Sequence, residues 1–253
     1  MAANMDELRT LTREDAVQVI TEMIQAYRNG HDGKMPRALI AVGGAAMALH
    51  NIRPISNDID LYAPEDAFLP IALDLEKRTG IRIDVTSKTN LFGHINVRDV
   101  EQDAQVLERV TMEGFQIDIA AISPETLFVI KASTMREKDR ADLPGLWNVV
   151  TPQDILKRTQ TLLPNLDTSW TGEETLLNIL SEMRLAGMSQ VEASWFRDAP
   201  VLAKKYASLI EEAFGVDILR GVEPEFAHKE VYEPARHGTG GVAPGNDGST
   251  AMP

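Results

Sequence analysis

Two aspartates separated by a single residue carry the clearest chemical signal in this sequence. Asp58 and Asp60 stand in the segment DIDLY, whose alternation of polar and apolar residues predicts a strand. Side chains two residues apart in a strand share one face, so both carboxylates point the same way while Ile59 and Leu61 enter the core. Hard divalent ions such as Mg²⁺ prefer oxygen ligands of this kind. We therefore expect a metal site here; the alternative is an ordinary solvated strand.

A third carboxylate is the candidate that completes this site. Asp118 lies in the alternating segment FQIDIAAIS, between the apolar residues Ile117 and Ile119. A charged residue inside so apolar a strand needs a partner or a cation. If this strand lies beside the DIDLY strand, we expect Asp118 to converge with Asp58 and Asp60 on one point.

A glycine pair precedes these carboxylates. Gly43 and Gly44 follow the apolar run ALIAV and precede AAMALH, a good helix former. Glycine lets the backbone approach a ligand, and the start of a helix offers free N–H groups to a phosphate. The segment is neither a P-loop nor a dinucleotide-binding fingerprint, because neither consensus is present. The alternative is a plain turn between strand and helix.

The apolar spacing predicts the elements that must position these residues. Expected helices run from the N-cap Thr12 to Gly30 and from Ala67 to Arg78, and further helices begin after the caps Ser123 and Thr151. Expected strands cover 38–42, 59–62, 81–87, 105–112 and 115–121, and the last two meet in a hairpin turn at Glu113-Gly114. We therefore expect an α/β fold of the α+β type, with a mixed sheet and flanking helices in residues 1–150. An all-helical domain, 151–227, and a disordered tail, 228–253, would follow.

The composition excludes several classes of protein. The chain has 253 residues, a net charge of −13, 43% apolar residues and no cysteine. Disulfide and thiolate chemistry are therefore excluded, and a cytoplasmic location without a membrane span is expected. The acidic balance argues against a surface that binds nucleic acid broadly, although one local basic strip remains compatible with it.

The ordered motifs resemble one known superfamily. Gly-Gly, HNIR (50–53), SNDIDLY (56–62), a later strand aspartate and LFVIKASTMREKDRADL (127–143) are similar to the polymerase-β-type nucleotidyltransferases. Within that superfamily the sequence most resembles the nucleotidyltransferase-like toxins of abortive-infection and toxin–antitoxin systems. The resemblance covers residues 38–145 and leaves the helical half unmatched. It implies the nucleotidyltransferase-type mixed sheet for the first half.

The resemblance also implies roles for individual residues. Asp58, Asp60 and Asp118 would be catalytic and would bind two Mg²⁺ ions, for which Mn²⁺ can substitute. Nucleotide and phosphate would be bound by Gly43, Gly44, Arg53, Ser56, Lys131, Arg136 and Lys138. Alternatives drawn from the residues stay open in this region. Arg53 would simply pair with an aspartate, and His50 of the HNIR motif would pack or cap. Lys138, Asp139, Arg140 and Asp142 would form a solvated charged face.

The implied activity is transfer of a nucleoside monophosphate from a triphosphate such as ATP to a hydroxyl acceptor. A tRNA 3′ end, a protein side chain and a small molecule are all open as acceptors, and an antitoxin partner is expected if the chain is a toxin. Phosphate transfer to the toxin's target or its antitoxin is a rival reaction on the same fold. The alternative from another class is a non-catalytic binding or regulatory protein with a relic of the fold.

Overall fold

The computed structural model describes residues 10–31, 35–54, 58–87, 95–112, 114–166, 170–187 and 190–221. All of them belong to one compact unit that spans 1–222. The predicted tail, 228–253, lies outside the described residues. The predicted division of the chain near residue 150 stays a prediction.

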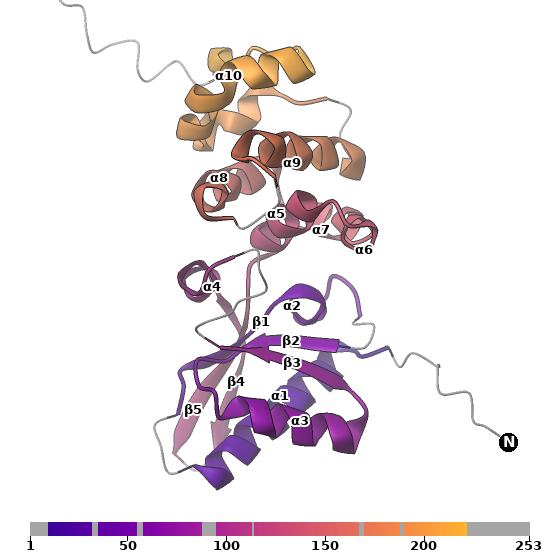
Figure 1. The fold of residues 1–253 in the computed structure, drawn as a ribbon, viewed down its shortest axis with the longest axis vertical. Helices are drawn as coiled ribbons and strands as arrows, with labels where there is room; N and C mark the ends of the chain where they lie inside the picture. Colours follow the sequence, from indigo (N-terminus) through magenta and orange to yellow (C-terminus); the bar gives the residue numbers. More distant parts are fainter. Residues whose placement is uncertain are drawn as a thin grey trace, which may run out of the picture. The chain divides into compact units, whose positions relative to one another are not determined.

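A five-stranded mixed sheet forms the first half of the described chain (Figure 1). Its strands are β1 (Ala38–Ala41), β2 (Asp58–Tyr62), β3 (Arg82–Thr86), β4 (Gln105–Met112) and β5 (Phe115–Ala121), in the spatial order β3-β2-β1-β5-β4. Strand β1 is antiparallel to β2 and parallel to β5, whereas β2 is parallel to β3. The predicted mixed sheet, with the segments after Ala38, Asp58 and Phe115 as its members, is confirmed.

The helices begin and end where local sequence chemistry favours it. They are α1 (Arg13–Gly30), α2 (Gly43–Leu49), α3 (Phe68–Thr79), α4 (Val97–Asp103), α5 (Pro124–Thr134), α6 (Glu137–Arg140), α7 (Leu143–Trp147), α8 (Pro152–Leu162), α9 (Gly172–Gly187) and α10 (Pro200–Phe214), with short 3-10 turns η1 (Leu163–Asn165), η2 (Ala193–Asp198) and η3 (Ile218–Gly221). Thr12, Ser123 and Thr151 each accept a hydrogen bond from the backbone N–H three residues on, which confirms the three predicted N-caps. Gly80 ends α3 in the left-handed conformation.

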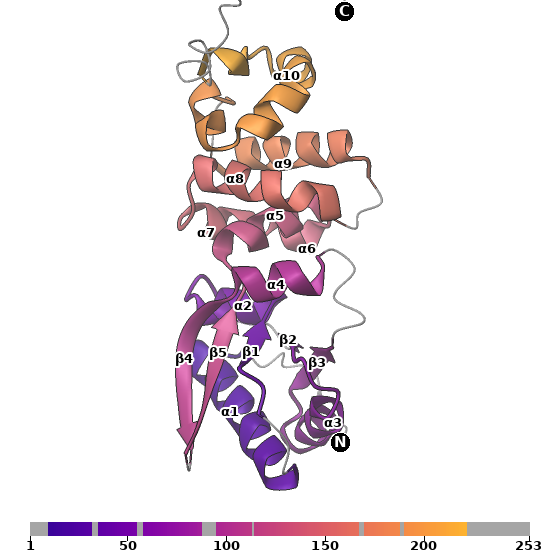
Figure 2. The ribbon, with the colours of Figure 1, turned by 90° about the vertical axis from the view of Figure 1, so that its left-hand side faces the viewer.

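The two faces of the sheet have different environments. Helices α1 and α3 lie together against one face (Figures 1 and 2), where the rings of Tyr27 and Phe68 stack at 4.4 Å. Ile59 and Leu61 are fully buried on that face. Because side chains alternate along a strand, Asp58 and Asp60 point to the opposite face, which α4 borders (Figure 2). The sheet thus separates its apolar core from its carboxylates.

The remaining helices pack mainly on one another. Helix α5 contacts α7, α8 and α9, and α10 contacts α8, α9 and the 3-10 turn η2. Within the described ranges, no helix has the length and apolar character needed to cross a bilayer. Helix α4, which the sequence analysis did not predict, starts at Asn96, whose side chain accepts the N–H of Asp99. Its position over the polar face of the sheet makes it relevant to the second cavity described below.

Candidate functional site

Three carboxylates converge at one place on the polar face of the sheet. Asp58 and Asp60 come from β2, as predicted, and Asp84 comes from the parallel neighbour β3, where its partner in the register is Asp60. One carboxylate oxygen of each residue lies within 4.8 Å of one oxygen of each of the other two. A group of oxygen donors this close matches the coordination preference of Mg²⁺ and Mn²⁺. The residues present therefore fit the metal that the sequence implied.

The three aspartates carry negative charges that repel one another, and the pKa of Asp60 reflects its burial and this repulsion. Burial raises the pKa of Asp60 to about 6, and the negative charges of Asp58 and Asp84 act in the same direction. The positive charges of Lys138 and Arg82 oppose the rise only in part. Asp84 is paired with Arg82 at 2.8 Å, whereas Asp58 and Asp60 have no ion pair with another described residue. These two carboxylates are therefore short of positive charge, as expected of a site that a cation completes.

Gly43 lies so close to the carboxylate of Asp60 that a side chain would not fit between them. It has a φ of +53°, a conformation that side chains other than glycine rarely adopt, and it begins α2. A Cβ at this position would lie 2.7 Å from Oδ2 of Asp60. The backbone N–H of Val42 also donates to the carbonyl oxygen of Asp60 at 3.0 Å. The first glycine of the pair is therefore the one that the fold requires, because it leaves room for the acid.

The cluster opens into a cavity of about 300 Å³. The three aspartates, Gly43 and Arg82 line one side, and Lys131, Arg136 and Lys138 of the α5–α6 segment line the other. Lys138 is exposed and has no ion pair with another described residue. Negative and positive side chains thus face each other across one hollow, an arrangement suited to a metal-bound polyphosphate.

Three of the implied basic residues are already paired with two buried aspartates, Asp139 and Asp142. Lys131 Nζ lies 3.0 Å from Asp139 and 2.8 Å from Asp142, and only 9% of the Lys131 side chain is exposed. Arg53 donates from two nitrogens to Asp142, and Arg136 donates to Asp139. Burial opposes ionisation of Asp139, but the charge of Lys131 and the surrounding hydrogen bonds outweigh it and hold the pKa of Asp139 below its usual range. The expected solvated face is wrong for these two aspartates, while the pairing alternative for Arg53 is confirmed.

The structure does not bring Asp118 to the cluster. Asp118 pairs with Ala38 in the β1–β5 register, whereas Asp60 lies beside Val42, so the two aspartates differ by four residues, or about 13 Å, along the strands. Its carboxylate instead accepts a hydrogen bond from Arg109 Nε at 2.7 Å. The expected convergence of Asp118 with Asp58 and Asp60 is therefore corrected: the charge is satisfied by a cation on β4, and Asp84 takes the third place.

Of the remaining residues that the sequence analysis singled out, those that the structure describes are not part of the acidic cluster. Gly44 is the second residue of α2, and Ser56 lies outside the described residues. His50 makes a 2.9 Å hydrogen bond between Nε2 and the carbonyl oxygen of Ile122, so its expected packing role is confirmed. The residue that sequence reasoning missed is Asp84. Its signal was present, because a strand joined to DIDLY by one helix is expected as its parallel neighbour.

Comparison with known proteins agrees with this geometry. A family described as a nucleotidyltransferase of unknown function (DUF6036) matches residues 16–160 of the chain. The matched range contains the three clustered aspartates, Gly43 and the basic residues across the cavity. No curated protein and no solved structure matches the chain.

Substitution of Asp60 by Asn tests the repulsion. A carboxyl group with a raised pKa in the folded state stabilises the fold fully below pH 3.8 and loses that contribution as the pH rises through 6. In EDTA, Asp60→Asn should therefore melt higher than wild type at pH 8 and similarly at pH 4. The gain in the free energy of unfolding should be on the order of 1–2 kcal/mol, since a tenfold change in proton affinity corresponds to about 1.4 kcal/mol and solvent screens part of it.

The matched control is Asp74→Asn, at an exposed residue of α3 whose one ion pair within the described part of the chain is with Arg78. A difference in melting that does not change between pH 4 and 8 would contradict this account.

Substitution of Gly43 by Ala tests the close approach. The added Cβ should displace the carboxylate of Asp60 and lower Mn²⁺ affinity at least tenfold, measured by calorimetric titration. Gly80→Ala is the control, because Gly80 has a φ of +71° but nothing within 4 Å of the added Cβ. Both variants should lose about 1 kcal/mol of stability from the strained backbone, while only Gly43→Ala should lose metal affinity. Equal Mn²⁺ affinity in the two variants would remove Gly43 from the site.

Proposed function

The chain belongs to this family of nucleotidyltransferases, and we propose that it transfers a nucleoside monophosphate from a nucleoside triphosphate to a hydroxyl acceptor. The observation that carries the proposal is the cluster of Asp58, Asp60 and Asp84 at the mouth of a cavity whose opposite wall is basic. Divalent ions held there would neutralise the triphosphate and stabilise the attacking and leaving oxygens of an in-line displacement.

Each wall of the cavity has its own task in this proposal. Asp58 and Asp60 would hold the ions. Burial raises the pKa of Asp60, the charges of Asp58 and Asp84 raise it further, and bound cations would offset these effects. The backbone of Gly43 and Gly44 receives the phosphates at the start of α2. Lys138, whose charge already acts on Asp60, faces the negative charge that builds up on departing pyrophosphate.

The reaction follows from these positions. The acceptor oxygen forms a bond to the α-phosphorus, and the bond from that phosphorus to the bridging oxygen of the β-phosphate breaks, which releases pyrophosphate. The proton of the acceptor hydroxyl passes to a carboxylate oxygen of Asp84, which takes the role first expected of Asp118. Lys131 does not contact phosphate in this scheme. It holds Asp139 and Asp142, and through Asp139 it positions Arg136 at the rim.

The resemblance of the motifs extends the proposal to a biological setting. We place the protein among toxins of toxin–antitoxin or phage-defence systems, acting in the cytoplasm with an antitoxin as partner. The relic-fold alternative is less consistent with the cluster, since three close carboxylates destabilise a protein that has no cation to bind.

Paired aspartate variants give the decisive experiment. Asp84→Asn should abolish the Mg²⁺- and nucleotide-dependent rise in melting temperature and should lower pyrophosphate release at least a hundredfold, because it removes one carboxylate of the cluster. Asp118→Asn removes the same charge from the same sheet but breaks only the pair with Arg109. It should therefore retain the Mg²⁺ response. The measurements are thermal melting with each of the four triphosphates and pyrophosphate release in the presence of cell lysate.

Two outcomes would reject parts of this proposal. If wild type shows no shift with Mg²⁺ and any triphosphate, the enzyme assignment is wrong and the relic-fold binding protein takes its place. If Asp118→Asn loses the metal response while Asp84→Asn keeps it, the assignment of the third ligand is wrong.

A further inference from the structure

A second cavity, of about 330 Å³, lies on the same face of the sheet as the acidic cluster. The same three strands line both cavities, with an offset of two residues. Val42, Asp60 and Ile122 border the first cavity, and Ile40, Tyr62 and Ala120 border the second. Two residues correspond to about 7 Å along a strand. The second cavity is therefore displaced from the carboxylates by two residues along the strands.

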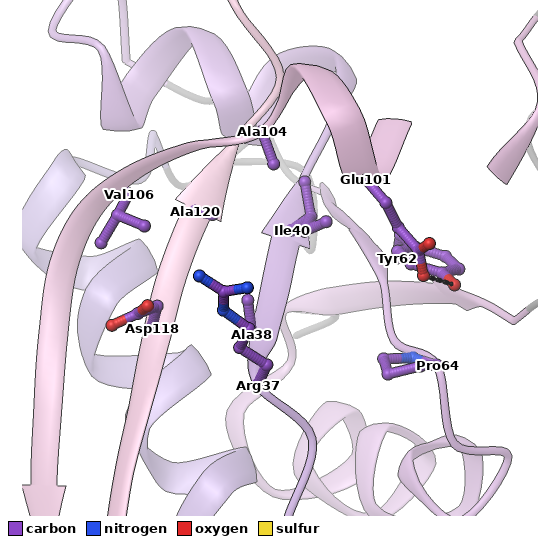
Figure 3. A pocket seen from close by; sticks show the side chains of 10 residues that line it. All are labelled: Arg37, Ala38, Ile40, Tyr62, Pro64, Glu101, Ala104, Val106, Asp118 and Ala120. Atoms are coloured by element: carbon purple, nitrogen blue, oxygen red, sulfur yellow. Dashed lines mark hydrogen bonds between the residues drawn. The ribbon is translucent and has the colours of Figure 1, made fainter. Parts of the chain in front are cut away.

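The acidic groups of this second cavity already have partners. Asp118 accepts from Arg109, and Glu101 of α4 accepts a 2.8 Å hydrogen bond from the buried hydroxyl of Tyr62 (Figure 3). The floor between them is apolar and flat, since small or branched side chains of β1 and β5, such as Ala38, Ile40 and Ala120, form it.

Arg37 is the one basic residue among those that line this cavity, and its side chain is exposed. Figure 3 shows its side chain between Asp118 on one side and the Tyr62–Glu101 pair on the other. Among the described residues, its guanidinium makes no hydrogen bond and no ion pair, although its backbone carbonyl accepts the N–H of Asp118. A guanidinium presents a fork of donors that matches a phosphate group.

We propose that the second cavity is the acceptor subsite, and that it binds a small phosphorylated hydroxyl compound through Arg37. This inference rests on the proposed transfer reaction and names its substrate class. The phosphate lies on Arg37, the uncharged body of the acceptor lies on the floor of Ile40 and Ala120, and its hydroxyl points along the sheet toward Asp84. The net charge of −13 favours a small compound with one phosphate over a long polyanion, which the rest of the surface would repel.

The test separates this cavity from the metal site by omitting the metal. In EDTA the acidic cluster repels anions, whereas Arg37 requires no cation. Binding of ribose 5-phosphate and of cytidine 5′-monophosphate is measured by calorimetric titration against ribose and cytidine. Wild type should bind each phosphorylated probe at least tenfold more tightly than its unphosphorylated counterpart.

The variants then assign that difference to one side chain. In Arg37→Gln the difference in affinity between the phosphorylated and unphosphorylated probes should fall below twofold. Arg37→Lys should keep part of that difference. The control Arg197→Gln, at an exposed arginine of η2 that lines neither cavity, should behave as wild type. With Mg²⁺ and an α,β-methylene triphosphate present, the phosphorylated probe should still bind, because the two cavities share no lining residue.

Several results would overturn the inference. They are equal binding of phosphorylated and unphosphorylated probes to wild type, an unchanged difference in Arg37→Gln, and competition between the probe and the triphosphate analogue. A short oligoribonucleotide that binds more than tenfold more tightly than the monophosphate would overturn the small-molecule assignment. Failure of the proposed function would instead appear as absent Mg²⁺-dependent triphosphate binding, which these metal-free titrations do not involve.

Discussion

The mutual repulsion of three carboxylates is the constraint around which the first half of this molecule is organised. Asp58, Asp60 and Asp84 would move apart if their backbones could yield. They cannot, because β2 and β3 are hydrogen-bonded in register and Ile59, Leu61 and Ile83 are buried on the other side of the sheet. The hydrophobic effect acting on one face thus holds an unfavourable charge arrangement on the opposite face. The glycine at the start of α2 removes the steric barrier that would otherwise push Asp60 out of this arrangement.

The charges around this cluster fall into two groups with different functions. Lys131, Asp139 and Asp142 form a buried network that the partly exposed Arg53 completes, and such a network fixes the geometry of a fold more than it raises stability. Lys138 and Arg37 lie outside it and have no ion pair with the described residues. The paired charges therefore fix the segment that borders the first cavity, and the unpaired cations Lys138 and Arg37 remain for ligands.

Local chemistry made much of the fold predictable. The caps at Thr12, Ser123 and Thr151 and the stop at Gly80 define helix ends through interactions within a few residues. The alternation around Asp58 and Asp60 fixed their shared face in the same way. The third carboxylate of the cluster was harder to predict, because its identity depends on which strands become neighbours, a property that composition does not encode. Even so, Arg109 and Asp118 are equally distant from the predicted turn at Glu113-Gly114, so the hairpin register alone indicated a cation opposite Asp118. Helix α4 went unpredicted because a single short polar helix has little apolar periodicity.

Asp142 links two parts of the site that are distant in sequence. Its carboxylate holds Arg53, which shortly precedes β2, and Lys131 of α5, from which the segment bearing Lys138 continues. The strand that bears Asp58 and Asp60 and the segment that bears Lys138 therefore share one anchoring residue. If metal and nucleotide bind as proposed, occupancy of either side would bias the position of the other, and the two ligands would be thermodynamically linked. By that linkage, whatever factor the nucleotide adds to metal affinity, the metal must add to nucleotide affinity.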